Sequence, residues 1–136
     1  MRLALILLPF LLLTPLAACS GPAAPQDVGV CWLAGADASG PARYTPVARG
    51  VDSLESCAVL LEAMRLRGRA EVDGAYQGYF IFADSRQISS AVHTGGIRYP
   101  IFQPPQRASV DRDLTRLMKE RGGALPEAGA LSLERN

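Results

Sequence analysis

The chain has 136 residues, of which 49% are hydrophobic and 20% are charged, with 14 basic and 13 acidic side chains. This length allows one small domain rather than several. The near balance of charge argues against a nucleic-acid partner, because binding to phosphates requires clustered positive charge.

The first 18 residues have the pattern of a secretory signal peptide. Arg2 makes the amino end positive, residues 3–16 are an apolar run, and the small residues Ala17 and Ala18 close it. The run is shorter than the roughly 20 residues that a bilayer-spanning helix needs, and two prolines interrupt it. We therefore expect residues 1–18 to be cleaved rather than to remain as a transmembrane anchor.

The four residues Leu16-Ala17-Ala18-Cys19 resemble the lipobox of bacterial lipoproteins. The resemblance implies cleavage before Cys19 and attachment of lipid to its thiol, so that the partner of the mature amino end is a lipid bilayer. It also implies, through Ser20, sorting to the outer membrane facing the periplasm. The alternative is an ordinary signal peptide with an accidental cysteine. Removal of residues 1–18 leaves 136 − 18 = 118 residues and equal numbers of acids and bases.

Composition divides the mature chain into three parts. Residues 19–27 are small, polar and rich in proline, which predicts a lipidated linker. Residues 28–102 hold nearly all aromatic and β-branched residues and are expected to form one small domain. Residues 103–136 form a C-terminal extension, in which we expect a short helix over 110–121 and a disordered tail from residue 122.

The first half of the domain predicts two strands and a helix. Residues 28–34 and 43–48 are the expected strands. Asp52 is expected to cap a helix over 53–67, with Glu55 three residues on. Apolar residues at helical spacing give this helix one buried face, and Gly68 is typical of a helix end.

The second half predicts strands. Residues 75–83 read as one strand rich in aromatics, in which Gly78 can mark a bulge. Residues 87–93 and 97–102 flank a turn and read as a hairpin, whose second arm lies at a sheet edge because it contains Pro100. The fold class expected is α+β, a small antiparallel sheet with one packed helix.

Two cysteines lie within the domain. Cys31 is placed in the first strand and Cys57 on the buried face of the helix, in a chain expected to be exported to an oxidising compartment. We expect a disulfide between them, which would close a loop of 27 residues and stabilise the fold by about 3.5 kcal/mol in the chain-entropy treatment. Two free thiols or a catalytic thiol remain as alternatives.

No group of residues predicts catalysis. His93 could be combined with Ser89, Ser90 or Asp84 as a hydrolase triad, but no glycine-flanked serine precedes a helix. The carboxylates Glu55, Glu62, Glu71 and Asp73 are expected at solvent-facing or loop positions. We expect no catalytic residue, no metal site once the cysteines are paired, and no cofactor.

Tyrosines give the remaining candidate for a binding surface. Tyr76, Tyr79 and Tyr99 could line a groove for a peptide or a glycan, although we favour a packed aromatic core, because aromatic residues supply most of the burial in small cores. The expected function is that of a small accessory or binding lipoprotein of the cell envelope, whose partner is an envelope protein or a cell-wall polymer. The alternative is a small envelope enzyme, a hydrolase or a thiol-redox protein.

Overall fold

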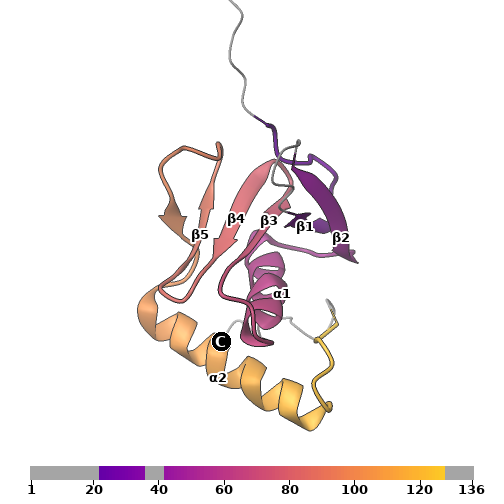
Figure 1. Cartoon of the computed structure of the whole chain (residues 1–136), viewed down its shortest axis with the longest axis vertical. Helices are drawn as coiled ribbons and strands as arrows, with labels where there is room; N and C mark the ends of the chain where they lie inside the picture. Colours follow the sequence, from indigo (N-terminus) through magenta and orange to yellow (C-terminus); the bar gives the residue numbers. More distant parts are fainter. Residues whose placement is uncertain (1–21, 36–41, 128–136) are drawn as a thin grey trace, which may run out of the picture.

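The structure, a computed structural model, describes residues 22–35 and 42–127, and it has the expected α+β fold (Figure 1). The leader and Cys19 lie outside the described residues. The sheet is antiparallel with strand order β2-β1-β3-β4-β5-β6. The strands are β1 (Val30–Gly35), β2 (Arg43–Arg49), β3 (Val72–Tyr76), β4 (Tyr79–Ala83), β5 (Ile88–Ala91) and β6 (Tyr99–Pro100). The helices are α1 (Leu54–Leu66) and α2 (Pro104–Glu120).

Helix α1 lies where the sequence predicts a helix, but its cap is one residue later than expected. The Ser53 side chain accepts a hydrogen bond from the Ser56 backbone N–H, so Ser53 occupies the N-cap position. Asp52 instead accepts a hydrogen bond from the Ser56 hydroxyl at 2.7 Å. The prediction of Asp52 as the cap was therefore wrong in register, although both residues stabilise the same helix end.

Residues 75–83 form a hairpin, and the prediction of a single strand was wrong. Tyr76 and Tyr79 are paired across β3 and β4, and the two residues between them both have positive φ angles, 44° at Gln77 and 85° at Gly78. Such angles suit a two-residue hairpin turn, and glycine adopts them without strain. Gly78 is a turn residue and not a bulge within a strand.

The hairpin of β5 and β6 is confirmed, with β6 at the edge of the sheet. Both strands are shorter than expected, because residues 92–98 form the connection between them. Pro100 lies in β6. An edge strand tolerates proline, because the missing backbone N–H does not remove a hydrogen bond between two central strands.

One face of the sheet packs on α1. The closest approach is at Gly74 of β3, where any side chain would collide with Leu61 of α1 and with the Trp32 carbonyl. Cys31 and Ile81 lie in the same layer and are fully buried. Glycine at position 74 is therefore required by packing rather than by a turn.

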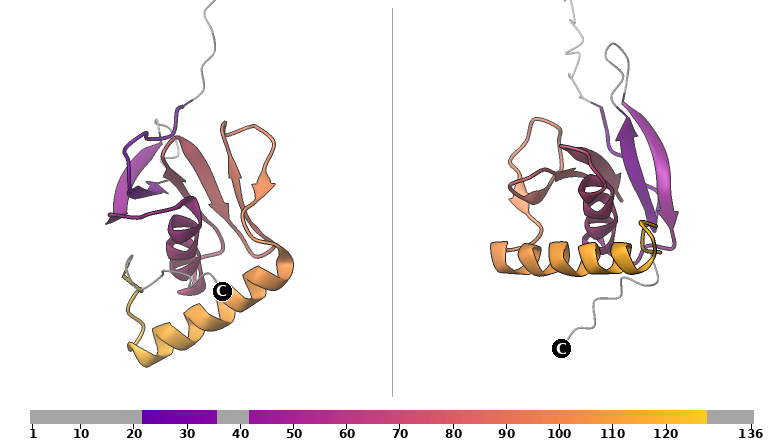
Figure 2. Two further views of the ribbon diagram at one scale, coloured as in Figure 1. Left: turned by 180° about the vertical axis from the view of Figure 1, so that it is seen from behind. Right: turned by 60° about the horizontal axis from the view of Figure 1, so that its bottom comes forward.

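Helix α2 begins six residues earlier than predicted. Pro104 and Pro105, expected to end the folded part, instead occupy the first turn of α2, where a missing N–H costs nothing. The helix lies across the bottom of α1 (Figures 1 and 2) and buries Val110, Leu114 and Met118 in the same core. The expected boundary at residue 102 therefore does not separate α2 from the core.

An ion pair joins the two helices. Glu62 of α1, expected to face solvent, is fully buried. It receives a hydrogen bond from Arg107 of α2 at 2.8 Å and two from Arg65 at 2.6 and 2.8 Å. Arg107 also donates to the Asp84 carbonyl oxygen at 2.7 Å. The prediction failed at Glu62 because its partner lies 45 residues away in the sequence.

Both ends of the described chain pack more closely than the sequence predicts. Within the expected linker, Ala24 is buried, and the Gly78 N–H donates to the Pro25 carbonyl oxygen at 2.8 Å. Beyond α2, Pro126 is buried and Leu125 packs against the core, so the expected disordered tail does not begin at residue 122. Residues 128–136 lie outside the described part. Within residues 22–35 and 42–127, no helix is both long and apolar enough to cross a membrane.

Candidate functional site

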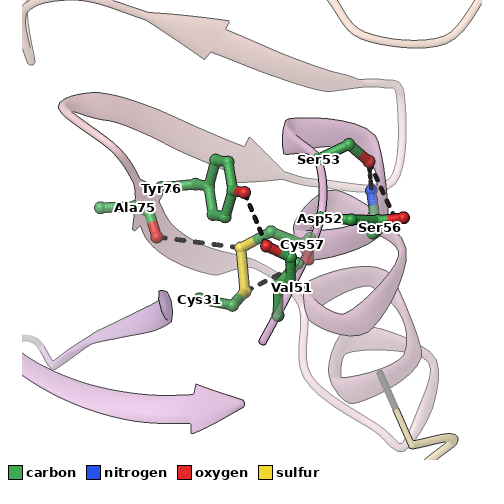
Figure 3. The surroundings of a disulfide bond; sticks show 8 residues. All are labelled: Cys31, Val51, Asp52, Ser53, Ser56, Cys57, Ala75 and Tyr76. Carbon is green, nitrogen blue, oxygen red and sulfur yellow. Dashed lines mark hydrogen bonds between the residues drawn. A yellow bond between two sulfur atoms is a disulfide. The ribbon is translucent and has the colours of Figure 1, made fainter. Parts of the chain in front are cut away.

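The expected disulfide is present between Cys31 of β1 and Cys57 of α1 (Figure 3). The two Cα atoms are 5.3 Å apart, within the usual range for a disulfide, and both residues are fully buried. The bond joins the sheet to the first turns of α1. Because both thiols are consumed, Cys31 and Cys57 supply no nucleophile and no metal ligand in this state.

Backbone and tyrosine atoms surround the disulfide. The Cys31 sulfur lies 3.5 Å from the Cys57 carbonyl oxygen, and the Cys57 sulfur lies 3.8 Å from that of Ala75. These are contacts without a shared proton, since a disulfide sulfur carries no hydrogen. Beside them the Tyr76 hydroxyl donates to the Val51 carbonyl oxygen at 2.8 Å (Figure 3). This environment is that of a structural bridge, closed to solvent.

The expected tyrosine groove does not exist as one surface. Tyr76 is buried in the core, with its hydroxyl satisfied by Val51. Tyr79 and Tyr99 are exposed, at the start of β4 and in β6. The prediction failed because residues 75–83 were taken as one strand, and the turn at residues 77–78 changes which side chains share a face.

The face of the sheet opposite α1 is the strongest candidate for a binding site. Strand register places two rows of side chains on it, which we call the aromatic face. One row is Trp32, Ala75, Phe80 and Ala91. The other contains Asp73, Phe82 and Ser89, with Tyr44 of β2 packing against the same cluster. The Phe80 and Phe82 ring centres are 6.4 Å apart.

The aromatic face forms the floor of an open hollow of about 600 Å³. Phe80, Phe82 and Tyr44 line it, and the carboxylates of Glu71 and Asp73 stand at its wall. Alongside, the Arg98 guanidinium lies over the Phe82 ring, 3.7 Å from its centre, which is a cation–π contact. The hollow thus brings aromatic side chains together with two acidic residues, and Arg98 packs on one of the rings, that of Phe82.

The surroundings of the hollow raise the pKa of one carboxyl, that of Asp73. Burial raises the pKa of Asp73, Arg98 acts to lower it, and the charges of Glu71 and Asp84 raise it further. The pKa of Tyr44 is raised by burial and by the negative charge of Asp73, so its hydroxyl stays neutral at physiological pH. The site therefore presents a neutral phenol beside an aspartate whose pKa is raised.

Two polar atoms of the aromatic face have no hydrogen-bond partner among the described residues. They are the indole nitrogen of Trp32 and the hydroxyl oxygen of Ser89, and both are buried. Buried polar groups are nearly always satisfied, so two such atoms on one face are unusual. Arg107 and Asp111, at the junction of the two helices, also have one such atom each, so the aromatic face is one of two places where buried polar atoms lack a partner among the described residues.

The candidate triad is not assembled. His93 is exposed in the β5–β6 connection, whereas Asp84 lies beyond the opposite end of β5. The Asp84 carboxylate is occupied by the backbone N–H groups of Arg86 at 2.6 Å and Gln87 at 2.9 Å. Ser89 is fully buried beneath the aromatic face. Within the described ranges, no three His, Cys, Asp or Glu side chains converge on a point where a metal ion could bind.

Sequence reasoning missed the aromatic face, although a signal for it existed. Trp32, Phe80 and Phe82 sit at alternate positions of their strands, offset from Cys31 and Ile81, which mark the face toward α1. Comparisons with protein families, with curated proteins and with solved structures gave no match. A functional assignment therefore rests on the residues and geometry described above.

Proposed function

We propose that this chain is an exported lipoprotein of the cell envelope, anchored through acylated Cys19, and that its domain is a small binding module that uses the aromatic face. The lipobox-like residues 16–19 support the anchor. The observation that carries export is the buried Cys31–Cys57 disulfide, because such bonds persist in oxidising compartments and are rare in the cytosol.

A lipid anchor of this kind suits a domain in whose described residues no helix is long and apolar enough to span a membrane. Each buried methylene of an acyl chain contributes about 0.8 kcal/mol, so a single chain binds marginally and two or more bind stably. Diacylglycerol at Cys19 would meet that requirement. Ser20 after Cys19, by the resemblance to bacterial lipoproteins, favours the outer membrane as the destination, with the domain in the periplasm.

The chemistry of the aromatic face favours a cell-wall polymer as the partner. The partly exposed Tyr44 ring can pack against the C–H face of a sugar, and the Glu71 and Asp73 carboxylates can accept hydrogen bonds from hydroxyl or amine groups. The Phe80 and Phe82 rings are more than nine-tenths buried and support this surface from within. A hollow of this size accommodates one or two sugar rings. An envelope protein bound at the same face is the second outcome that a binding experiment distinguishes.

The anchor is tested by metabolic labelling with a palmitate analogue followed by membrane fractionation. Label should appear on the wild-type chain and be absent from Cys19→Ser, which should accumulate as uncut precursor or leave the membrane. Cys31→Ser is the matched control, because it removes a different cysteine and should keep the label. A labelled Cys19→Ser chain, or an unlabelled wild type, would refute the proposal.

The binding face is tested by cosedimentation with isolated cell-wall sacculi. Tyr44→Ala and Asp73→Ala should each reduce the bound fraction, since both residues line the hollow. Arg116→Ala is the matched control, because Arg116 lies on the outer side of α2 and is two-thirds exposed. Wild-type protein that remains in the supernatant, while crosslinking through the hollow captures an envelope protein, would replace the polymer with that protein.

A further inference from the structure

The described chain begins at one end of the molecule. The Gly78 N–H holds Pro25 against the β3–β4 turn at 2.8 Å, and Ala24 beside it is 5% exposed. The β5–β6 connection lies at this same end, and α2 lies at the opposite end (Figures 1 and 2). We call the β3–β4 turn with the start of β4 (residues 77–79), together with the β5–β6 connection and the start of β6 (residues 92–99), the proximal end.

Exposed hydrophobic side chains gather at the proximal end. Among the described residues, five large hydrophobic side chains are strongly exposed, and four of them belong to the start of β4 and to the β5–β6 hairpin. These four are Tyr79, Val92, Ile97 and Tyr99. Tyr79 directly precedes Phe80 and Val92 directly follows Ala91, and Phe80 and Ala91 are paired, so Tyr79 and Val92 lie at the same end of these two strands.

The length of chain before the described residues limits what can cover this surface. Only Ser20 and Gly21 separate Cys19 from Pro22, so three residue steps cover the distance. At about 3.3–3.6 Å per residue, they reach roughly 10 Å when fully extended. The step from Cys19 to a membrane rests on the function proposed above. Given that anchor, the proximal end cannot move far from the lipid headgroups.

The composition of the proximal end matches a membrane interface. Tyrosine is enriched at the boundary between headgroups and acyl chains, because its ring is apolar and its hydroxyl is polar. The connection from residue 92 to residue 98 contains no acidic residue and carries His93 and Arg98. It therefore presents no negative charge of its own to the phosphates of lipid headgroups.

We propose that the proximal end is a membrane-contact surface, in which Tyr79, Val92, Ile97 and Tyr99 rest in the headgroup region of the bilayer that holds Cys19. Since Pro25 and Ala24 are fixed to the fold, the anchor does not end in a free linker. The domain is held in one orientation, with α2 directed away from the membrane.

Tryptophan quenching tests this orientation. The acylated mature protein is placed in vesicles of phosphatidylethanolamine and phosphatidylglycerol that contain lipids brominated near the headgroup. The tryptophan fluorescence of the Ile97→Trp protein should be quenched at least about threefold more than that of the Arg116→Trp protein. An indole at the membrane interface contacts the brominated part of the lipids. Both positions are exposed, and Trp32 gives the same background in each protein. Val92→Trp is a second probe of the same end.

The outcomes separate this inference from the function on which it rests. The mass of each protein establishes first whether Cys19 carries lipid. Acylated protein in which the Ile97→Trp and Val92→Trp variants are quenched no more than Arg116→Trp would overturn the contact surface and leave the anchor intact. Absence of lipid on Cys19 would overturn both. Strong quenching at positions 97 and 92 alone supports the orientation.

Discussion

The disulfide is the residue-scale feature that most directly links this sequence to its stability. Cys31 and Cys57 are 26 positions apart and join β1 to α1, so the bond restricts a substantial loop of the unfolded chain. Replacing both by alanine should lower the free energy of unfolding by about 2–5 kcal/mol, the usual effect of losing a native bridge in a small secreted fold. Urea denaturation measures it.

Reduction of the wild type provides the control for that experiment. Dithiothreitol should lower the urea midpoint of the wild type and leave the Cys31→Ala/Cys57→Ala protein unchanged. A double variant as stable as the oxidised wild type would mean that packing around Tyr76 and Leu61, rather than the bond, secures this layer.

Two aspartates near the hollow should respond to pH in opposite directions. Burial raises the pKa of Asp73. A carboxyl with a raised folded pKa contributes stability at low pH that is lost as the pH rises through that pKa. Asp73→Asn should therefore flatten the decline of unfolding free energy above about pH 4, the range of an unperturbed carboxyl. Its stability at neutral pH should be equal to that of the wild type or higher.

Asp84 supplies the matched control of opposite sign. Burial tends to raise the pKa of Asp84, but the backbone N–H groups of Gln87 and Arg86, helped by Arg107, lower it overall. The Asp84 carboxylate therefore stabilises the fold at pH values above the pKa that it has in the unfolded chain. This stabilisation is lost as the pH falls through its lower pKa in the folded protein. Asp84→Asn should thus be less stable at neutral pH. Urea midpoints across a pH series measure both variants, and equal profiles would contradict the assignment.

At the scale of elements, α2 is part of the core rather than an appendage. Leu114 and Leu117 have the same chemistry on one helix, but Leu114 is buried and Leu117 is only half-buried. Leu114→Ala should lower the free energy of unfolding by about 2–5 kcal/mol, because it leaves a cavity against α1. Leu117→Ala should lower the free energy of unfolding clearly less, because less of this side chain is buried. Thermal or urea melts of the two variants decide, and equal losses would contradict the packing described.

The sequence predicted those elements whose signals are local. Helix α1 has a cap and a periodic apolar face, and the β5–β6 hairpin has a turn between two strand-like segments, so both were found. The start of α2 was missed because Pro104 and Pro105 read as an end when they are considered without the core. The turn after Tyr76 was missed because Gln77 is a rare residue at positive φ.

Contacts distant in sequence account for the remaining differences. The burial of Glu62 depends on Arg107, and the position of Ala24 depends on the β3–β4 turn. Local patterns carry no information about either. The candidate site shared this problem, because the aromatic face is assembled from several strands that become neighbours only through the sheet order.

At the scale of the whole molecule, the features form one consistent arrangement. Ala24 and Pro25 pack at the proximal end, the disulfide fastens the sheet to α1, and α2 closes the opposite end of the core (Figure 1). The aromatic face lies on the side of the sheet opposite α1, which neither helix of the described residues covers. A binding module held at a membrane by a short tether would present this face to a polymer or protein lying close to the bilayer.

The intact mass of the protein, extracted from membranes without reducing agent, tests the central claim most directly. The account predicts a chain of 118 residues that begins at Cys19, since 136 − 18 = 118. It predicts the added mass of a diacylglyceryl group on that residue, with or without an N-acyl chain, and two hydrogen atoms fewer for the Cys31–Cys57 bond. A mature chain that begins at another residue and carries no lipid, or an uncleaved chain of 136 residues, would contradict it.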